Sequence, residues 1–390
     1  MSASPIVVVF VTVFIDLLGF GIVIPLLPFY AERFGATAFT VGMLATSFSL
    51  MQFIFAPLWG RLSDRVGRRP IILIGLLGSS LAYLAFGLAS TLTALFAARV
   101  FAGIAGANIP TAQAVMADLT DPENRAKGMG LFGAAFGLGF IFGPAIGGFL
   151  SRFGYSVPAF FASGLALANL VAASFLLPET LKPENRAVER VGRIDALRAA
   201  LARPHLPLLM VIGFLAIGAF SSYESTFALF SERMFGLTAS SIGYVFAFVG
   251  VIMVVVQGFL VGKVAKFLGE HHVVPASLAV VAVGLLMLPA TRSIEAMLLA
   301  SGIMSAGMGF NNPSLMSLIS RYSSAEDQGG VMGLIQSLNS LARIAGPVWG
   351  GFAFDRLGIG MPYISGAAVM AVASALAVRA LWKARLAAGA

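Results

Sequence analysis

The chain contains no cysteine, and it is poor in histidine and in charge. Of its 390 residues three are His and 11% are charged, whereas a soluble protein averages about 25% charged residues. Without Cys there is no disulfide, no thiol redox centre and no Cys-ligated metal, and we expect neither a metal site nor a cofactor. Because 58% of the residues are hydrophobic, lipid is predicted to be the main solvent.

Long apolar runs recur along the whole chain. A membrane-spanning helix needs about 20 apolar residues, and strands of a β-barrel would instead alternate over about 10 residues. The first run has no basic residue before it and no clear cleavage site, so it is not predicted to be a removable signal. We predict an all-α integral membrane protein with twelve spans, at 5–29, 39–59, 70–89, 93–117, 128–150, 158–177, 207–230, 239–261, 273–290, 295–318, 330–351 and 362–381.

The net charge of +8 is distributed unevenly over the loops. If both termini lie on the same side of the membrane, the loops on that side carry most of the 25 Lys and Arg residues. Basic loops remain in the cytoplasm, so both termini are predicted to be cytoplasmic. The basic surplus then reports topology, and we expect no nucleic-acid partner.

The second half of the sequence resembles the first half at an offset of about 203 residues. "GPAIGGFLSRFG" at 143–154 matches "GPVWGGFAFDRLG" at 346–358. "GRLSDRVGRR" at 60–69 matches the degenerate "GKVAKFLGEH" at 262–271. The chain is therefore predicted to be an internal duplication.

Two six-helix bundles follow from this duplication. They cover 1–177 and 207–390, and a polar cytoplasmic linker at 178–206 joins them. Since six is an even number, both halves enter the membrane from the same side and are parallel repeats. Transporters built from such repeats bind substrate near the membrane midplane, between the repeats.

Three motifs resemble signatures of the major facilitator superfamily. "GRLSDRVGRR" at 60–69 is similar to the signature between the second and third helices, and "RVFAGIAGA" at 99–107 to the fourth-helix motif. "GLGFIFGPAIGG" at 137–148 is similar to the fifth-helix motif of antiporters. The chain most resembles the twelve-span drug–proton antiporters, and its first, second and fifth helices look like those of tetracycline–proton antiporters.

This resemblance implies the function as well as the fold. It implies a proton-coupled antiporter of the cell inner membrane that exports a lipophilic, cationic small molecule by alternating access, without enzyme activity. Tetracycline antiporters carry further acids in the third and ninth helices, where this chain has Ala82 and about Val281. The resemblance therefore predicts the fold and the coupling mechanism better than it predicts the substrate. A major facilitator carrier of a sugar, lipid or other metabolite is the alternative. The expected partners are the substrate, protons and the bilayer, and we expect a monomer.

Four ionisable residues fall inside predicted spans: Asp16, Arg99, Glu224 and Arg343. A charge at the centre of a span costs about 2.5–3.5 kcal/mol on insertion scales, so we expect Asp16 to approach Arg99 and Glu224 to approach Arg343. Two static ion pairs would explain these residues structurally. Because an intramembrane charge is by default a functional site, we predict that all four take part in proton coupling.

The 60–69 motif has a role in the family, where it forms a latch that holds the cytoplasmic side shut. Asp64 is expected near the start of the eleventh helix, and Asp118 is expected to pair with Arg65 or Arg68. The second half is expected to have lost its latch, because Lys266 stands at the position of Asp64. The resemblance assigns as latch residues Gly60, Asp64, Arg65, Gly67, Arg68, Arg69 and Asp118.

The fifth-helix motif removes side chains from one helix face and places a proline in it. Close packing of the helix accounts for this pattern. The resemblance adds that this seam lies against the second half and seals the outer side. The antiporter-motif residues are Gly139, Gly143, Pro144, Gly147 and Gly148.

Polar and aromatic residues of the spans are candidates for substrate contact. Each buried amide is more often a link between helices than a ligand contact, but several lie on helices that line the cavity in the superfamily. The substrate-binding candidates are Phe20, Gln52, Asn108, Gln113, Phe220, Phe227, Asn311, Asn312, Gln336 and Asn339.

Overall fold

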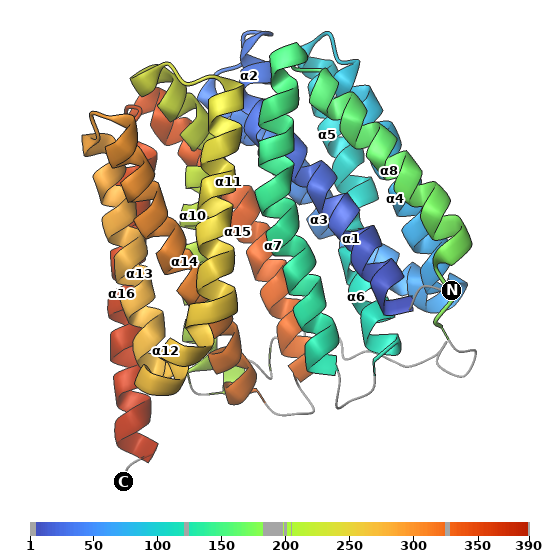
Figure 1. Ribbon diagram of the computed structural model, residues 1–390. Helices are drawn as coiled ribbons and strands as arrows, with labels where there is room; N and C mark the ends of the chain where they lie inside the picture. The colour runs from blue at the N-terminus through green and yellow to red at the C-terminus, as the bar shows by residue number, and fades with distance from the viewer. Residues whose placement is uncertain are drawn as a thin grey trace. The chain divides into compact units, whose positions relative to one another are not determined.

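A computed structural model describes residues 5–120, 125–181, 198, 201–203, 205–323 and 328–388, and at 125–129, 132, 328–329, 380 and 382–388 it describes the backbone alone. Every regular element among these residues is a helix (Figure 1). The all-α prediction therefore holds for the described part of the chain. Most of the predicted linker at 178–206 lies outside it.

The helices of the first half follow the predicted spans, and several spans are divided by a short change of helix type. Pro25 and Pro110 lie at such divisions, where a proline lacks the N–H that a continuous helix needs. The elements are α1 (Pro5–Val23), η1 (Ile24–Leu26), α2 (Leu27–Glu32), α3 (Ala38–Val66), α4 (Arg68–Gly87), α5 (Leu92–Ala105), η2 (Gly106–Asn108), α6 (Ile109–Asp118), α7 (Arg125–Leu150), η3 (Ser151–Phe153) and α8 (Val157–Leu176).

The second half repeats this order of long helices. Its eighth predicted span contains one π-helical turn, η5, between two α-helical parts. The elements are α10 (Leu206–Phe235), α11 (Ala239–Val255), η5 (Val256–Leu260), α12 (Val261–Leu268), α13 (Glu270–Met287), η6 (Leu288–Ala290), α14 (Ile294–Tyr322), α15 (Gln328–Arg356) and α16 (Met361–Ala388).

The chain divides into two compact units. Unit 1 comprises Met1–Thr37, Leu44–Glu189 and Leu237–Ala247, and unit 2 comprises Ala38–Met43, Arg190–Gly236 and Phe248–Ala390. In unit 1, α1 packs on α7 and α8, and α4 packs on α8 and α5. In unit 2, α10 packs on α15 and α16, and α13 packs on α16 and α14. The same pairs of equivalent helices thus form both bundles, as the internal repeat predicts.

Each predicted span is occupied by a helix in the described part of the chain. Ten helices there are long and apolar enough to cross a membrane by length and composition. The helices α14 and α15, which have 29 residues each, are not among the ten. The count of twelve spans therefore stays a prediction.

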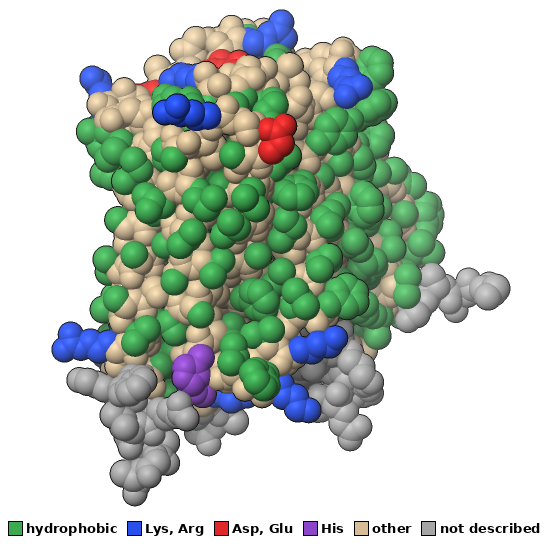
Figure 2. Space-filling model, turned by 60° about the vertical axis from the view of Figure 1, so that its left-hand side comes forward, with side chains coloured by type: hydrophobic (Ala, Val, Ile, Leu, Met, Phe, Trp, Pro, Cys, Tyr) green, Lys and Arg blue, Asp and Glu red, His purple; other side chains and the backbone are tan. Residues whose placement is uncertain are grey.

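Apolar side chains cover the outside of the helices. On α13, Val280, Val283 and Leu286 are exposed, and Phe259 of η5 is 69% exposed. Figure 2 shows one face on which hydrophobic side chains predominate in the middle, while Lys and Arg lie toward both ends and the visible Asp and Glu toward one end. Such a surface is stable in lipid and would aggregate in water.

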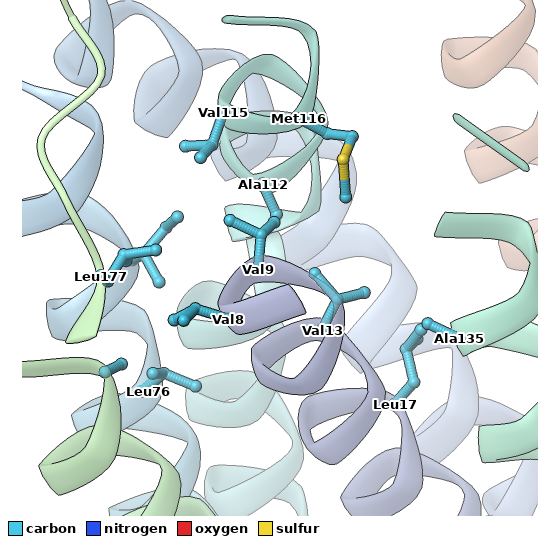
Figure 3. Packing of buried hydrophobic residues seen from close by; sticks show 12 residues of the cluster. Val8, Val9, Val13, Leu17, Leu76, Ala112, Val115, Met116, Ala135 and Leu177 are labelled. Carbon is cyan, nitrogen blue, oxygen red and sulfur yellow. The ribbon is translucent and has the colours of Figure 1, made fainter. Parts of the chain in front are cut away.

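The core of unit 1 contains an apolar cluster near the start of α1 (Figure 3). Val9 and Val13 of α1 face Ala112 of α6, and Val115 and Met116 extend the cluster along α6. Residues three and four apart share one helix face, so these side chains form continuous stripes. The cluster closes the interior of unit 1 on the side of the chain's N-terminus.

Candidate functional site

Asp16 lies on α1 with its side chain half-buried in unit 1. Its neighbour is the hydroxyl of Ser79 on α4, which interacts with the carboxylate by hydrogen bonding. Within the described residues no Lys or Arg nitrogen lies within 4 Å of this carboxylate. The direct approach of Arg99 to Asp16 predicted from the sequence is therefore wrong.

Arg99 of α5 is buried and meets an aromatic ring in place of a carboxylate. Its guanidinium carbon lies 4.4 Å from the centre of the Phe48 ring, a cation–π contact, and its Nε has no hydrogen-bond partner within the described residues. Tyr83 of α4 interacts electrostatically with both Asp16 and Arg99. The ring of Tyr83 fills the space beside Gly19, 3.0 Å from where a Cβ would be. Tyr83 is thus a shared electrostatic neighbour of the two charges.

A small pocket of about 20 Å³ adjoins Asp16 inside unit 1. Thr12, Asp16 and Asn108 are its polar wall. Its apolar wall is shared with the cluster of Figure 3 and consists of Val13, Leu17, Ile72, Leu76, Ile109 and Ala112. The acid in the first span therefore borders a small pocket as well as protein.

Glu224 of α10 occupies the corresponding region of unit 2. It is half-buried and interacts electrostatically with Arg343 of α15, but no ion pair within 4 Å joins them among the described residues. The neighbouring Tyr223 is fully buried, and its ring lies edge-on to Tyr363 at 6.3 Å between ring centres. The electrostatic interaction is the one link between Glu224 and Arg343 among the described residues, and their role as a coupling pair stays a prediction.

Three of the substrate-binding candidates are buried or hydrogen-bonded to another helix. Phe227 and Asn311 are fully buried, at 0% exposure, and the Asn311 amide donates to Ser277 at 3.3 Å. Gln52 of α3 donates to the carbonyl of Gly106 at 3.1 Å. Phe227 and Asn311 are thus enclosed by protein in this structure, and their assignment to a substrate wall stays a prediction.

Apart from Phe227, Asn311 and Asn108, all substrate-binding candidates are at least partly accessible. Asn108 lines the pocket beside Asp16. Phe20 stacks on Phe48 with ring centres 5.3 Å apart, so it belongs to the aromatic surroundings of Arg99. Gln336 is exposed. The half-buried candidates are Phe20, Gln52, Gln113, Phe220, Asn312 and Asn339.

The glycines of the fifth-helix motif pack mainly on α1. A Cβ at Gly139, Gly143 or Gly147 would collide with the backbone or side chains of Leu17, Gly21 and Ile22. In the same motif only Gly148 meets α11, where the Cβ position lies 2.9 Å from the Cα of Gly243. The expected seam against the second half is corrected: the interface is with α1, except at Gly148. Pro144 lies inside α7, and its carbonyl also borders Gly243.

The latch motif forms a buried cluster of charges at the junction of α3 and α4. Arg68 is 8% exposed, contacts Asp64 directly, and places its Nε 3.4 Å from Asp118. Arg68 also donates to the Ser63 hydroxyl at 2.8 Å. Of the two predicted partners of Asp118, the structure selects Arg68, while Arg65 is exposed.

Gly60, Gly67 and Arg69 complete this region. Gly67 adopts φ +122° at the start of α4, a conformation that a side chain would strain, whereas a Cβ at Gly60 would meet nothing within 4 Å. Arg69 donates to the carbonyl of Ser174 on α8. The expected position of Asp64 beside the eleventh helix concerns both units and stays a prediction.

Glu179 was missed by the sequence analysis, which placed it in the linker. Its carboxylate accepts the backbone N–H groups of Arg68 at 2.9 Å and Arg69 at 3.1 Å, and so caps α4. Partial burial acts to raise the pKa of Glu179, but hydrogen bonds from the backbone N–H groups of Leu181, Arg68, Arg69 and Thr180 outweigh it and lower the pKa. An acid directly after Pro178, where the sixth span ends, was the available signal.

Asp355 was missed as well. In unit 2 its carboxylate accepts the backbone N–H groups of Ala38 at 3.2 Å and Phe39 at 2.8 Å, and so caps the start of α3. In unit 1 the position equivalent by the repeat offset is Arg152, which donates to the hydroxyl of Ser240 at 2.9 Å near the start of α11. Sequence matching pairs these two residues but gives no information about what they touch.

Charged side chains buried inside bundles of apolar helices, together with a duplicated architecture, define a multi-pass membrane transporter. The family model described as Major Facilitator Superfamily matches residues 9–269 and 235–389. The chain belongs to the Major Facilitator Superfamily.

Individual relatives cover nearly the whole chain. It is 32% identical over 377 residues to "Multidrug resistance protein 2" of Bacillus subtilis (strain 168), covering 95% of this chain and 93% of the relative. It is 33% identical over 353 residues to "Tetracycline resistance protein, class C" of Escherichia coli, covering 89% of each. Among solved structures, the human organic anion transporter MFSD10 (TETRAN) superposes with a TM-score of 0.74 at 27% identity, covering 96% of this chain and 99% of that one.

Proposed function

We propose that this protein exports a lipophilic, cationic small molecule in exchange for protons, by alternating access. The observation that carries the proposal is Asp16, a carboxylate in the first span with no Lys or Arg nitrogen within 4 Å among the described residues. Relatives named for multidrug and tetracycline resistance, each about a third identical, support drug export.

Asp16 couples proton entry to substrate export, because the proton and the cationic substrate compete for its carboxylate. On the outward-facing side it takes a proton and loses its attraction for a cationic substrate, and on the inward-facing side it releases the proton and attracts the next substrate. Arg99 sets the electrostatic balance through Tyr83, and Glu224 with Arg343 is the second coupling pair. The half-buried candidates and Gln336 provide the polar and aromatic contacts to the substrate.

The proposed topology follows the distribution of basic residues. Both termini are cytoplasmic, twelve helices span the inner membrane, and the protein works as a monomer. The cluster of Asp64, Arg68 and Asp118 acts as the cytoplasmic latch, and Gly148 with Gly243 allows the close approach of α7 and α11. The ion contacts within the latch support this role, because they hold α3, α4 and α6 in a fixed arrangement.

The test is proton release on substrate addition, measured with purified protein in weak buffer. The substrates are tetracycline, the lipophilic cation tetraphenylphosphonium, a sugar and an aromatic carboxylate. We expect the cation to release protons from the parent and none from Asp16→Asn, because Asn keeps the shape but cannot titrate. Glu295→Gln, at an exposed acid at the start of α14, should match the parent.

Two results would contradict the proposal. If Asp16→Asn releases as many protons as the parent, the coupling carboxylate lies elsewhere, and Glu224→Gln is the next variant. If only the sugar or the carboxylate is transported in vesicles, the protein is a metabolite carrier. The carboxylate is included because a structural relative is named as an organic anion transporter.

A further inference from the structure

The pocket beside Asp16 combines three polar side chains from two parts of unit 1. Thr12 and Asp16 are one turn apart on α1, so they share a helix face, and Asn108 ends the short helix η2. Leu76 of α4 and Ala112 of α6 close the pocket on its apolar side. The pocket thus brings three polar side chains together on a wall that is otherwise apolar.

Two of the three polar side chains of this pocket, Thr12 and Asn108, lack protein partners among the described residues. Thr12 and Asn108 are each only 6% exposed, yet no hydrogen bond within the described residues involves either side chain. The bond at Thr12 uses its backbone carbonyl, which accepts from Asn169 at 3.0 Å. Asp16 has the hydroxyl of Ser79 as a neighbour and no cation. Buried polar groups in proteins almost always have a hydrogen-bond partner.

The size of the pocket fits one small occupant. It offers about 20 Å³, whereas one water requires at least about 10–15 Å³ and two to four polar partners. Thr12, Asp16 and Asn108 supply three. Most of the wall is apolar, but these three side chains give a water the hydrogen-bond partners that a wholly apolar cavity lacks.

We infer that this pocket binds one water molecule, which hydrogen-bonds Thr12, Asp16 and Asn108 and is the proton-transfer partner of Asp16. The second part rests on the proposed proton-coupled export. The water donates one hydrogen to the Asp16 carboxylate and accepts from the Thr12 hydroxyl, and the amide of Asn108 fixes its orientation.

The proton step balances around this water. When Asp16 is discharged, its O–H bond breaks, the proton joins the water oxygen to form hydronium, and the bonding electrons stay on the carboxylate. The hydronium then passes one proton to solvent water and is again neutral. The titratable neighbours facing this region are Tyr83 of α4 and Arg99 of α5, and the water lies on the Thr12 side, between α1 and α6.

The binding part is tested by a structure of the purified protein at a resolution that shows ordered water. We expect one water within hydrogen-bond distance of the three side chains. We expect it to be absent in Ala112→Val, where two added methyl groups fill the pocket. No water in the parent, at a resolution that shows other buried waters, would overturn the inference.

The proton-transfer part is tested in vesicles with Thr12→Val, Asn108→Leu and their combination, using tetraphenylphosphonium as substrate. Export driven by a proton gradient should slow by about tenfold per lost partner, the effect of a hydrogen bond to a charged group. Substrate–substrate exchange at equal pH moves no net proton, and in Thr12→Val it should stay at the parent rate. Thr111→Val is the matched control, because Thr111 is buried on α6 but does not line the pocket.

The outcomes separate this inference from the proposed function. If the parent releases no protons on substrate addition, the proposed function fails. If the parent releases protons and the double variant exports at the rate of Thr111→Val, the water is not the transfer partner. Replacing sodium by choline in all solutions should change nothing, and a loss of export there would assign the pocket to an alkali cation instead.

Discussion

The two halves of the molecule carry an ion pair at the same place with the charges exchanged. In the first half Arg68, the first residue of α4, lies 3.4 Å from Asp118 at the end of α6. In the second half Glu270, the first residue of α13, lies 3.3 Å from Arg321 near the end of α14. The repeat offset relates Arg68 to Glu270 and Asp118 to Arg321. The second half was expected to have lost this cluster, but it keeps an ion pair of opposite polarity.

The exchange has a consequence for the helix that follows. The N-terminus of a helix is electrically positive, so an acid there is favourable and a base is not. Glu270 satisfies this rule at the start of α13 and also accepts from Ser317 at 2.6 Å. Arg68 violates it at the start of α4, and Glu179 compensates by capping that helix. The offset places Trp382 where Glu179 stands, so the sequence of the second half has no acid at that position.

The largest expected loss of stability comes from exchanging the charges of the ion pair in the first half, so that it has the polarity of the pair in the second half. Arg68→Glu places a carboxylate among Asp64, Asp118 and Glu179 and should cost about 3–5 kcal/mol, as when a buried ion pair is broken. Adding Asp118→Arg restores an opposite charge and should recover part of the loss. Adding Glu179→Gln as well should recover more, because Glu179 then no longer repels the new acid. Heating the purified protein in detergent and following the folded fraction by size exclusion measures each step.

Arg65→Glu is the matched control for this series. It makes the same substitution in the same motif at an exposed position, where surface changes usually stay within about 0.5 kcal/mol. An Arg68→Glu protein as stable as Arg65→Glu would show that the ion pair contributes nothing to the fold.

A smaller, pH-dependent effect is expected from Glu179→Gln. Losing a charged cap should cost about 1 kcal/mol at pH 7. Because the folded pKa of Glu179 is lowered, its contribution is complete above the unfolded pKa of about 4.3 and disappears as pH falls through the folded value. The difference in unfolding temperature between parent and variant should therefore be constant from pH 6 to 7 and shrink below about pH 4. A difference that does not change with pH would mean that the charge of Glu179 plays no part.

The smallest loss of stability is expected from Arg321→Ala. The side chain of Arg321 is 72% exposed, and exposed ion pairs contribute about 0–1 kcal/mol. The loss should vanish in 1 M salt, where charges are screened beyond about 3 Å. Asp118→Ala, which removes one partner of the buried Arg68, should remain destabilising in the same salt. Equal salt sensitivity of the two variants would contradict the difference between a buried ion pair in the first half and an exposed ion pair in the second half.

Local features of the chain were readable in advance. Each predicted span coincides with a helix, and the internal repeat predicts which pairs of helices pack equivalently. Both predictions succeed because hydropathy and sequence similarity can be evaluated along the chain without knowing which distant residues are in contact. Asp16, Glu224 and Arg343 stood out for the same reason, since a charge in an apolar run is visible in a window of about 20 residues.

Contacts between helices were decided by tertiary structure. Asp16 has Ser79 and not Arg99 as its hydrogen-bonding neighbour, Phe227 and Asn311 are buried, and Gly143 meets α1 and not the second half. These outcomes depend on how far each helix is rotated about its axis, and a rotation by one residue, about 100°, changes the partner completely.

The sequence by itself determined a duplicated bundle of apolar helices with acids inside it and a charged motif after the second span. Only the tertiary structure decided that Glu179 caps α4, that Asp355 caps α3, and that a polar pocket adjoins Asp16. Lipid solvation acts on each residue separately, so composition records it. Hydrogen bonds and ion pairs act over about 3 Å between residues far apart in the chain, so they exist only once the helices are packed.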